Sequence, residues 1–316
     1  MPRSTSRTAS NKSQSQHLRP ASSPPEVVDP IWLLKAVGLA LVAALICAYL
    51  TLCLLFYQGQ WQVVLHPTRT SSGPPSISGI PYELIHFAPD ESAVPQLTGW
   101  WIPAAPAAPY VQSSILFLPG ADGSLANSIP TLATLHKLGI NIFAFDYRGY
   151  GQSAPAHPNQ QKMIRDAESA FLYLATSRSM SPSHIVLYGA NIGAPLAVQL
   201  ASTHPDVPAV ILDDPYSDLL PVAEHDPRAS ILPVRLLFRE RFPLAEPLSH
   251  LHTPKLLLSR CMSANRIFAT AADPKETVQL ATDNVSLFSR SVTQFLNQYL
   301  PPPSPRPPVT SPAPTP

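Results

Sequence analysis

The stretch Ile185-Val186-Leu187-Tyr188-Gly189-Ala190-Asn191-Ile192-Gly193-Ala194 carries the most information about the fold. Residues 185–188 are apolar at both odd and even positions, which predicts a strand buried on both faces, as in a parallel sheet. The two glycines permit a tight turn, and the apolar spacing from Ile192 to Ser202 predicts a helix. The stretch therefore indicates a buried strand that runs through a sharp turn into a helix.

Asn191 occupies the centre of that turn. In the pattern Gly-x-Ser-x-Gly the central serine is held exposed at the tip of the strand, where it loses its proton to a histidine and attacks a carbonyl carbon. A carboxamide has no ionisable proton near neutral pH and is a poor nucleophile. Asn191 is therefore the residue at the nucleophile position, and we do not expect it to react.

The two ends of the chain differ from the rest in composition. Residues 1–30 are rich in Ser, Arg and Pro, and residues 301–316 are almost wholly Pro, Ser and Thr. Neither end has the apolar periodicity that a core needs, so we predict a disordered N-terminal segment and a Pro-rich disordered tail. The net charge is +1 and charged residues make up 13% of the chain. This balance argues against a nucleic-acid partner.

Residues 31–57 predict one transmembrane helix. No charge occurs over the 22 residues from Ala36 to Tyr57, which at ~1.5 Å per residue is enough to cross a hydrocarbon core of ~30 Å. Trp32 and Tyr57 suit the two interfaces with water. The alternatives are a buried globular helix and a cleaved signal peptide. The length of the apolar run and its distance from Met1 disfavour the signal peptide.

Charge asymmetry gives the predicted orientation. Five basic residues precede the uncharged stretch, whereas the first charge that follows it is Arg69. Because an excess of positive charge stays in the cytoplasm, we predict a single-pass protein of the cell membrane with its N-terminus cytoplasmic. The large domain then lies on the outer, periplasmic or extracellular, side. The membrane is the predicted partner, and the sequence does not identify a protein partner.

In the large domain, residues 58–300, short apolar runs alternate with helix-like segments after a connecting stretch over 58–79. This alternation predicts a doubly wound α/β sandwich with helices on both faces of a mostly parallel sheet. The expected strands are Tyr82 to Phe87, Leu97 to Ile102, Ser114 to Leu118, Ile140 to Phe145, Ile185 to Tyr188, Ala209 to Leu212, Lys255 to Leu258 and Glu276 to Ala281. The expected helices are Ile129 to Leu138, Gln161 to Ala175, Ile192 to Ser202 and Leu287 to Leu300.

The order of several motifs resembles one family. The motifs are Leu65-His66-Pro67, Gly99-Trp100-Trp101-Ile102-Pro103, Leu118-Pro119-Gly120, Phe145-Asp146-Tyr147-Arg148-Gly149-Tyr150-Gly151-Gln152-Ser153 and the Thr253-Pro254 step. Together they resemble the α/β-hydrolase superfamily, and within it the membrane-anchored, lysophospholipase-like or serine-aminopeptidase-like branch. The resemblance implies the α/β-hydrolase fold. It also implies a nucleophile after the fifth strand, an acid after the seventh or sixth, and a histidine after the eighth.

The sequence departs from the family's pattern at all three catalytic positions. Asn191 replaces the nucleophile, no acid occurs between Pro254 and Asp273, and no histidine follows His252. Asp213 or Asp214, at the end of the sixth strand, is a candidate acid; the alternative is a strand-end carboxylate that caps the following turn. His225 is a candidate base only if its loop approaches the site. Cys261 is a candidate thiol nucleophile without an identified histidine partner.

The oxyanion position is better preserved than the triad. Gly120 and Ala121 follow the third strand and Ile192 follows the elbow residue, so their amides fit the expected donor positions. Such donors bind a carbonyl oxygen or an anion without any reaction, which makes a small acyl or carboxylate ligand a predicted partner. The alternative is a pocket filled by side chains. No pattern for a metal or a cofactor occurs, and we predict neither.

Two functions from different classes follow. The first is a membrane-anchored α/β-hydrolase-fold protein that is catalytically inactive and acts as a binding or scaffold domain. The alternative is an active esterase, lipase or peptidase of serine-hydrolase type that uses a non-standard triad. A fluorophosphonate probe separates the two, because it labels only a reactive serine.

Overall fold

The computed structural model describes residues 29–70, 72–74, 76–88, 94–216, 218–260, 265–281 and 284–301. The chain divides into two compact units, Met1–Thr51 and Leu52–Pro316. Apart from residues 29, 30 and 301, the ends for which we predict disorder lie outside the described residues.

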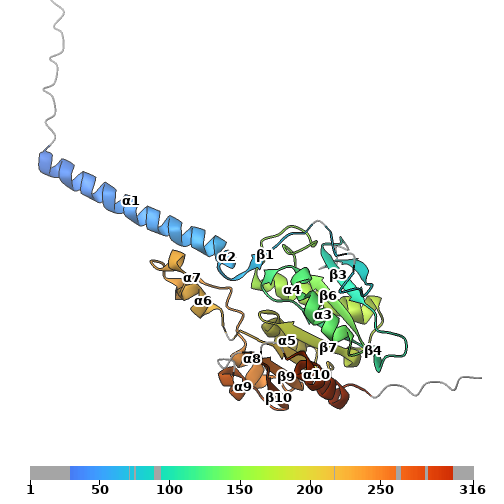
Figure 1. The fold of residues 1–316 in the computed structure, drawn as a ribbon. Coiled ribbons are helices and arrows are strands. Elements are labelled where there is room, and N and C mark those ends of the chain that lie inside the picture. Colours follow the sequence, from blue (N-terminus) through green and yellow to red (C-terminus); the bar gives the residue numbers. More distant parts are fainter. Residues whose placement is uncertain are drawn as a thin grey trace, which may run out of the picture. The chain divides into compact units, whose positions relative to one another are not determined.

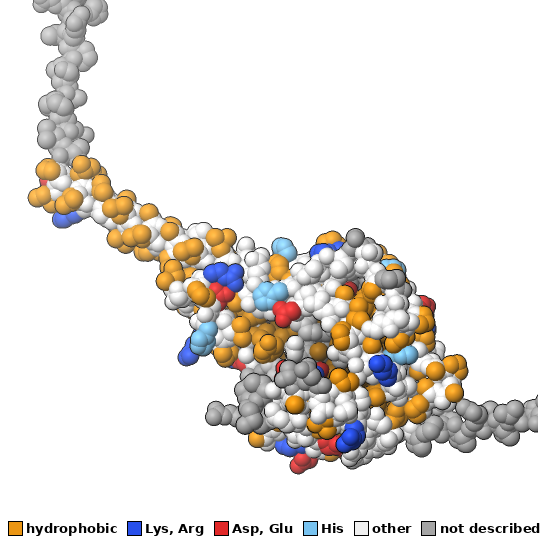
Figure 2. All heavy atoms as spheres, viewed as in Figure 1, with side chains coloured by type: hydrophobic (Ala, Val, Ile, Leu, Met, Phe, Trp, Pro, Cys, Tyr) orange, Lys and Arg blue, Asp and Glu red, His pale blue; other side chains and the backbone are white. Residues whose placement is uncertain are grey.

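The first unit consists, in its described part, of the beginning of α1 (Pro30–Gly59). This helix of 30 residues contains no buried residue, and Figure 2 shows that hydrophobic side chains cover most of it. At ~1.5 Å per residue it is ~45 Å long. Its most apolar window of 18 residues has none buried, and only Phe56 near its end packs against the core, so the helix is not the buried globular helix of the alternative. By length and composition α1 suits a membrane span or a signal sequence.

The second unit is built on an eight-stranded sheet in the order β10-β9-β8-β7-β4-β6-β3-β2 (Figure 1). Pairs from β10 to β6 are parallel, and β3 is antiparallel to both of its neighbours. The predicted mostly parallel α/β-hydrolase sheet is therefore confirmed. The bounds are β2 (Glu83–Phe87), β3 (Leu97–Ile102), β4 (Tyr110–Leu118), β6 (Ile140–Asp146), β7 (Ile185–Ala190), β8 (Val210–Asp213), β9 (Lys255–Ser259) and β10 (Lys275–Gln279).

Helices cover both faces of this sheet, and each face has its own apolar cluster. Leu187 of β7 packs in the cluster with α4 (Gln160–Leu172) and α5 (Gly193–Thr203). Its neighbour Tyr188 packs in the other cluster, with α3 (Ile129–His136) and α10 (Val285–Tyr299). Successive side chains of a strand point to opposite faces, so a strand covered on both sides must be apolar at every position. This explains the continuous apolar runs of the sequence.

Several short elements lie where we expected only connections. Residues 58–79 contain α2 (Trp61–Val64) and β1 (His66–Pro67), and β1 pairs with β5 (Asp122–Gly123). Between β8 and β9 the chain forms α6 (Leu220–Glu224), η4 (Pro227–Ala229), α7 (Val234–Leu237) and α8 (Ala245–His250). The remaining elements are η1 (Leu125–Ser128), a π-helical turn η2 (Tyr173–Ser177), η3 (Pro182–His184) and α9 (Asn265–Thr270). Each is too short to produce a detectable periodicity.

Candidate functional site

Asn191 lies between the end of β7 and the start of α5, in the left-handed region with φ of 49°. Its amide donates to the carbonyl oxygen of Asp213 at 2.9 Å, and its own carbonyl accepts from the amide of Ala194 at 3.2 Å. A Cβ at Gly189 would lie 2.5 Å from the Cα of Ala194, and a Cβ at Gly193 would overlap the carbonyl oxygen of Leu118. The glycines thus allow β7 and α5 to meet in a sharp turn that resembles a nucleophile elbow.

The structure places Gly120 directly beside Asn191. A Cβ at Gly120 would lie 3.3 Å from Asn191 Nδ2 and 3.4 Å from Asn191 Cβ, so the carboxamide faces this loop. The loop itself is anchored, because the carbonyl of Ala121 accepts from the His66 amide at 3.1 Å and from the Tyr150 hydroxyl at 3.0 Å. Ala121 and Ile192 are both buried. Of the three residues predicted for the oxyanion position, Gly120 thus faces the Asn191 side chain, and Ile192 directly follows Asn191 in the chain.

Asp213 is buried at the end of β8, the strand next to β7. One carboxylate oxygen is 2.5 Å from Arg260 Nη1, and the other accepts from the Tyr188 hydroxyl at 2.6 Å. Burial, with the nearby charge of Asp213, raises the pKa of the Tyr188 phenol well above its ordinary value, which keeps this hydroxyl a donor. Both oxygens of Asp213 are thus held by groups other than a histidine.

Arg260 is the site residue that the sequence argument did not identify. It follows β9, and its backbone amide also donates to Asp214 Oδ1 at 3.2 Å. A signal was present, because neighbouring parallel strands end at the same edge of a sheet and a basic residue after β9 therefore lies near a carboxylate after β8. Arg260 lines a cavity of about 160 Å³ together with Thr131, Leu280, Asn284 and Phe288, among others.

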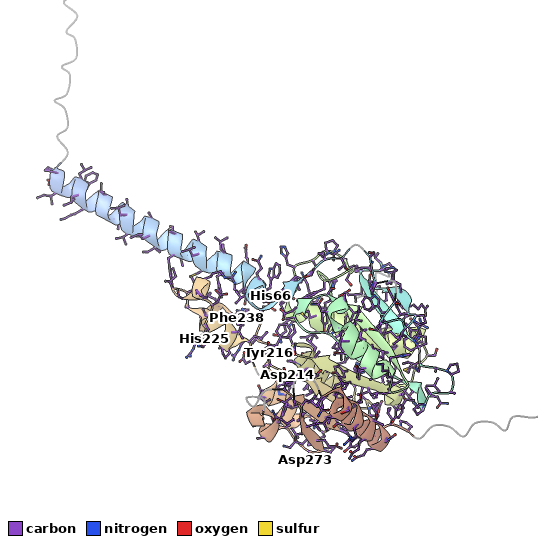
Figure 3. All side chains as sticks on the ribbon, viewed as in Figure 1. His66, Asp214, Tyr216, His225, Phe238 and Asp273 are labelled. Atoms are coloured by element: carbon purple, nitrogen blue, oxygen red, sulfur yellow. The ribbon has the colours of Figure 1, made fainter. Side chains whose placement is uncertain are left out.

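The candidate histidine base is hydrogen-bonded within its own segment. His225 Nδ1 lies 2.7 Å from the carbonyl oxygen of Pro221, one turn earlier in its own segment. In Figure 3 it projects from the edge of that segment, well separated from Asp214. His250 and His252 precede β9 and so lie at the opposite edge of the parallel sheet from the elbow. Within the described part of the chain, no histidine hydrogen-bonds to Asn191 or Asp213.

The remaining candidate, Cys261, lies outside the described residues. Ser153 is buried: its hydroxyl donates to the carbonyl of Asp146 at 2.5 Å and accepts from the amide of Thr98 at 2.9 Å. Ser153 therefore joins two strands. In the ranges that the structure describes, no group of three or more potential metal ligands occurs.

Asp146, at the end of β6, is a buried carboxyl beneath the glycine-rich turn that follows it. It accepts from the Leu125 amide at 2.7 Å, and the turn closes on it so tightly that a Cβ at Gly151 would overlap its carboxylate. Burial raises the pKa of Asp146 from 3.8 to about 6, which the hydrogen bonds and the charge of Arg69 oppose only in part.

This shift predicts a pH-dependent stability. Since the folded state binds this proton more tightly than the unfolded state, stability falls as pH rises from about 4 to about 6. The shift from 3.8 to about 6 corresponds to a loss of about 3 kcal/mol. Asp146→Asn keeps an acceptor for Leu125 and should remove this component of the pH dependence. Urea unfolding of the full chain at pH 4.5 and 7 measures it. Exposed Asp206→Asn is the control, and an unchanged pH slope in Asp146→Asn contradicts the prediction.

Comparison with known proteins gives consistent matches over the sheet domain. A family model described as alpha/beta hydrolase fold matches residues 114–293. An uncharacterized protein of Mycobacterium tuberculosis is 31% identical over 191 residues, which are 58% of this chain and 66% of that protein. Alpha/beta hydrolase domain-containing protein 17C of Xenopus tropicalis is 34% identical over 122 residues, 39% of this chain and 37% of the relative. The chain thus spans less than two thirds of the length of these curated relatives.

Among solved structures, an esterase of Pyrococcus furiosus has a TM-score of 0.58 with 19% identity. The superposition covers 75% of this chain and 98% of the esterase. At this identity the likeness concerns the fold alone.

Proposed function

This chain belongs to the α/β-hydrolase fold family, and we propose that it is a non-catalytic member, a binding or scaffold domain on a membrane anchor. The observation that carries the proposal is Asn191. It holds the elbow position, at a φ of 49°, with a carboxamide that cannot act as a nucleophile at neutral pH. The order of motifs further supports the membrane-anchored, lysophospholipase-like or serine-aminopeptidase-like branch, with the domain extending over residues 58–300.

The surroundings of Asp213 support the same conclusion. In an active hydrolase an acid orients the histidine that removes the nucleophile's proton. Here Arg260 and Tyr188 hold both oxygens of Asp213. A working triad would require His225 to leave the carbonyl of Pro221 and Arg260 to release Asp213. The alternative of an active esterase with a non-standard triad therefore needs two rearrangements before any chemistry begins.

The charges near the elbow favour a neutral ligand over an anion. Asp213, Asp214 and Arg260 together carry a formal charge of −1. An added carboxylate would meet this charge, whereas a carbonyl oxygen accepts hydrogen bonds from the elbow amides without adding charge. We therefore propose a small neutral acyl ligand, an ester or an amide, in place of a free carboxylate.

Asn191→Ser is expected to remain without esterase activity. The new hydroxyl would have no base within reach, and loss of a triad member alone typically costs ~10³-fold or more in rate. The test is hydrolysis of p-nitrophenyl butyrate by the folded full chain, with the parent and Asn191→Ala as controls and with fluorophosphonate labelling as a second readout. Turnover and labelling in the serine variant alone would refute the absence of a base and make His225 the next residue to replace.

We further propose that α1 is a single-pass anchor with the N-terminus in the cytoplasm, on the strength of the basic residues before it. A protease added to intact cells should then cut the sheet domain and spare the N-terminal segment. Epitope tags at the two ends report which part survives. Protection of the domain, with cleavage of the N-terminal tag, would show that the chain has the opposite orientation in the membrane.

A further inference from the structure

The segment between β8 and β9 exposes large apolar side chains. Val222 on α6 is 45% exposed, Leu236 on α7 is 78% exposed, and Ile231 between them is 67% exposed. The opposite side of the same segment packs into the core through Ala223, Ala229, Val234 and Phe238. We call the exposed side, defined by Val222, Ile231 and Leu236, the α6–α7 face. Because the segment is already anchored to the core by its other side, this exposed apolar face indicates a site of contact with another apolar surface.

This segment is attached to the residues that end α1. The guanidinium of Arg239 lies 5.7 Å from the ring centre of Tyr57, and the backbone amide of Arg239 donates to Gln60 Oε1 at 2.5 Å. Gln60 is buried, and α2 packs against α6. These contacts all lie within the second unit. The α6–α7 segment is therefore held beside Tyr57 and Gln60.

That attachment fixes the depth of the face, given the membrane anchor of the proposed function. The uncharged stretch of α1 ends at Tyr57, an aromatic residue of the kind that marks a membrane interface. Leu236 is three residues from Arg239, so its Cα lies within ~10 Å of the Cα of Arg239. Interfacial elements bury their apolar side chains ~5–10 Å into the boundary between head groups and acyl chains. Leu236 is thus within reach of that boundary.

We propose that the α6–α7 face inserts into the surface of the bilayer that α1 crosses, and that its partner is the lipid itself. The charges agree with insertion driven by apolar side chains. Over residues 218–241 four arginines balance four acidic residues. Arg228 pairs with Asp226 at 2.6 Å and Arg235 with Glu224 at 2.5 Å. A balanced surface gains little from anionic lipids, so contact with the bilayer should depend weakly on them.

Site-specific fluorescence in vesicles tests the proposal on the full chain. Cys47, Cys53 and Cys261 are replaced by alanine, and single cysteines are introduced as Val222→Cys or Leu236→Cys. The matched control is Val285→Cys, at a residue that is 59% exposed on α10. Each cysteine carries an environment-sensitive nitrobenzoxadiazole dye, and the protein is reconstituted in phosphatidylcholine vesicles. A spin-labelled lipid with its nitroxide near the head group quenches dyes at that depth.

We expect blue-shifted emission and severalfold stronger quenching at positions 222 and 236 than at 285. Equal, weak quenching at all three positions would overturn the proposal. So would a blue shift without quenching, which would mean that a second copy covers the face, or a severalfold gain in quenching when anionic lipid is added. Flotation of the vesicles after a carbonate wash tests the anchor separately. A chain that floats without quenching refutes the lipid contact alone, whereas a chain that does not float refutes the anchor on which the inference rests.

Discussion

Arg148→Ala is expected to lower the free energy of unfolding by about 3–5 kcal/mol, because it leaves a buried carboxylate without its partner. The side chain of Asp166 is fully buried, and Arg148 reaches it with Nε and Nη2, each at 2.7 Å from the same oxygen. The other oxygen accepts from the backbone amide of Arg148 at 2.9 Å. Burial raises the pKa of Asp166 even with Arg148 in place, so removal of the guanidinium raises it further.

Chemical unfolding of the full chain in detergent measures this loss. The matched control is Arg165→Ala, because Arg165 is exposed on α4 next to Asp166 in sequence, and its loss should change stability by less than about 0.5 kcal/mol. The two variants should differ less in their free energy of unfolding at acidic pH, because Asp166 then accepts a proton and no longer needs a counter-charge. Equal losses for the two variants, or a difference that does not change with pH, would contradict a role for the buried pair.

Gly193→Ala is expected to destabilise the protein by about 3 kcal/mol or more, through overlap with backbone that cannot move. The new Cβ would meet the carbonyl of Leu118 and lie 2.9 Å from the carbonyl oxygen of Pro119. Leu118 is fixed in the centre of the sheet, where β4 pairs with β7 on one side and with β6 on the other. The clash can be relieved only by separating α5 from the strand.

The matched control for this substitution is Gly59→Ala. A Cβ at Gly59 would meet no atom within 4 Å, and the residue is the last of α1. Gly59→Ala should therefore change the free energy of unfolding by no more than about 1 kcal/mol, or slightly raise it, since alanine favours helix. Differential scanning fluorimetry compares both variants with the parent. A fall in melting temperature of similar size for both would contradict the packing argument.

The strands were the most predictable part of this fold. The expectation for Leu97 to Ile102 matches β3, and Ile185 to Tyr188 lies within β7. Helices on both faces of a sheet require apolar residues at every position of a central strand, so the signal is local and strong. The expected strand from Glu276 to Ala281 instead runs as Lys275–Gln279, because the ends of a strand depend on pairing with its neighbour.

The segment between β8 and β9 was not predictable in the same way. Pro221 is the second residue of α6, Pro227 begins η4, and α7 has four residues. This segment is held by a hydrogen bond from the backbone amide of Arg239 to Gln60, which lies 179 residues earlier in the chain. In the candidate site, the motif order predicted that Asn191 and Gly120 would meet. The pairing of Arg260 with Asp213 depends on side-chain directions at two strand ends, which no local pattern records.

The left-handed conformation of Asn191 determines how much backbone strain this turn carries. Serine in this region of backbone space carries strain of about 1–3 kcal/mol, which an active enzyme tolerates because the strain presents its hydroxyl. Asparagine visits the same region more readily than most residues. Replacement of a serine by asparagine here thus relaxes the backbone while Gly189 and Gly193 keep its path. An elbow-shaped turn can therefore form with asparagine at its centre, since close packing of strand against helix is enough to preserve its path.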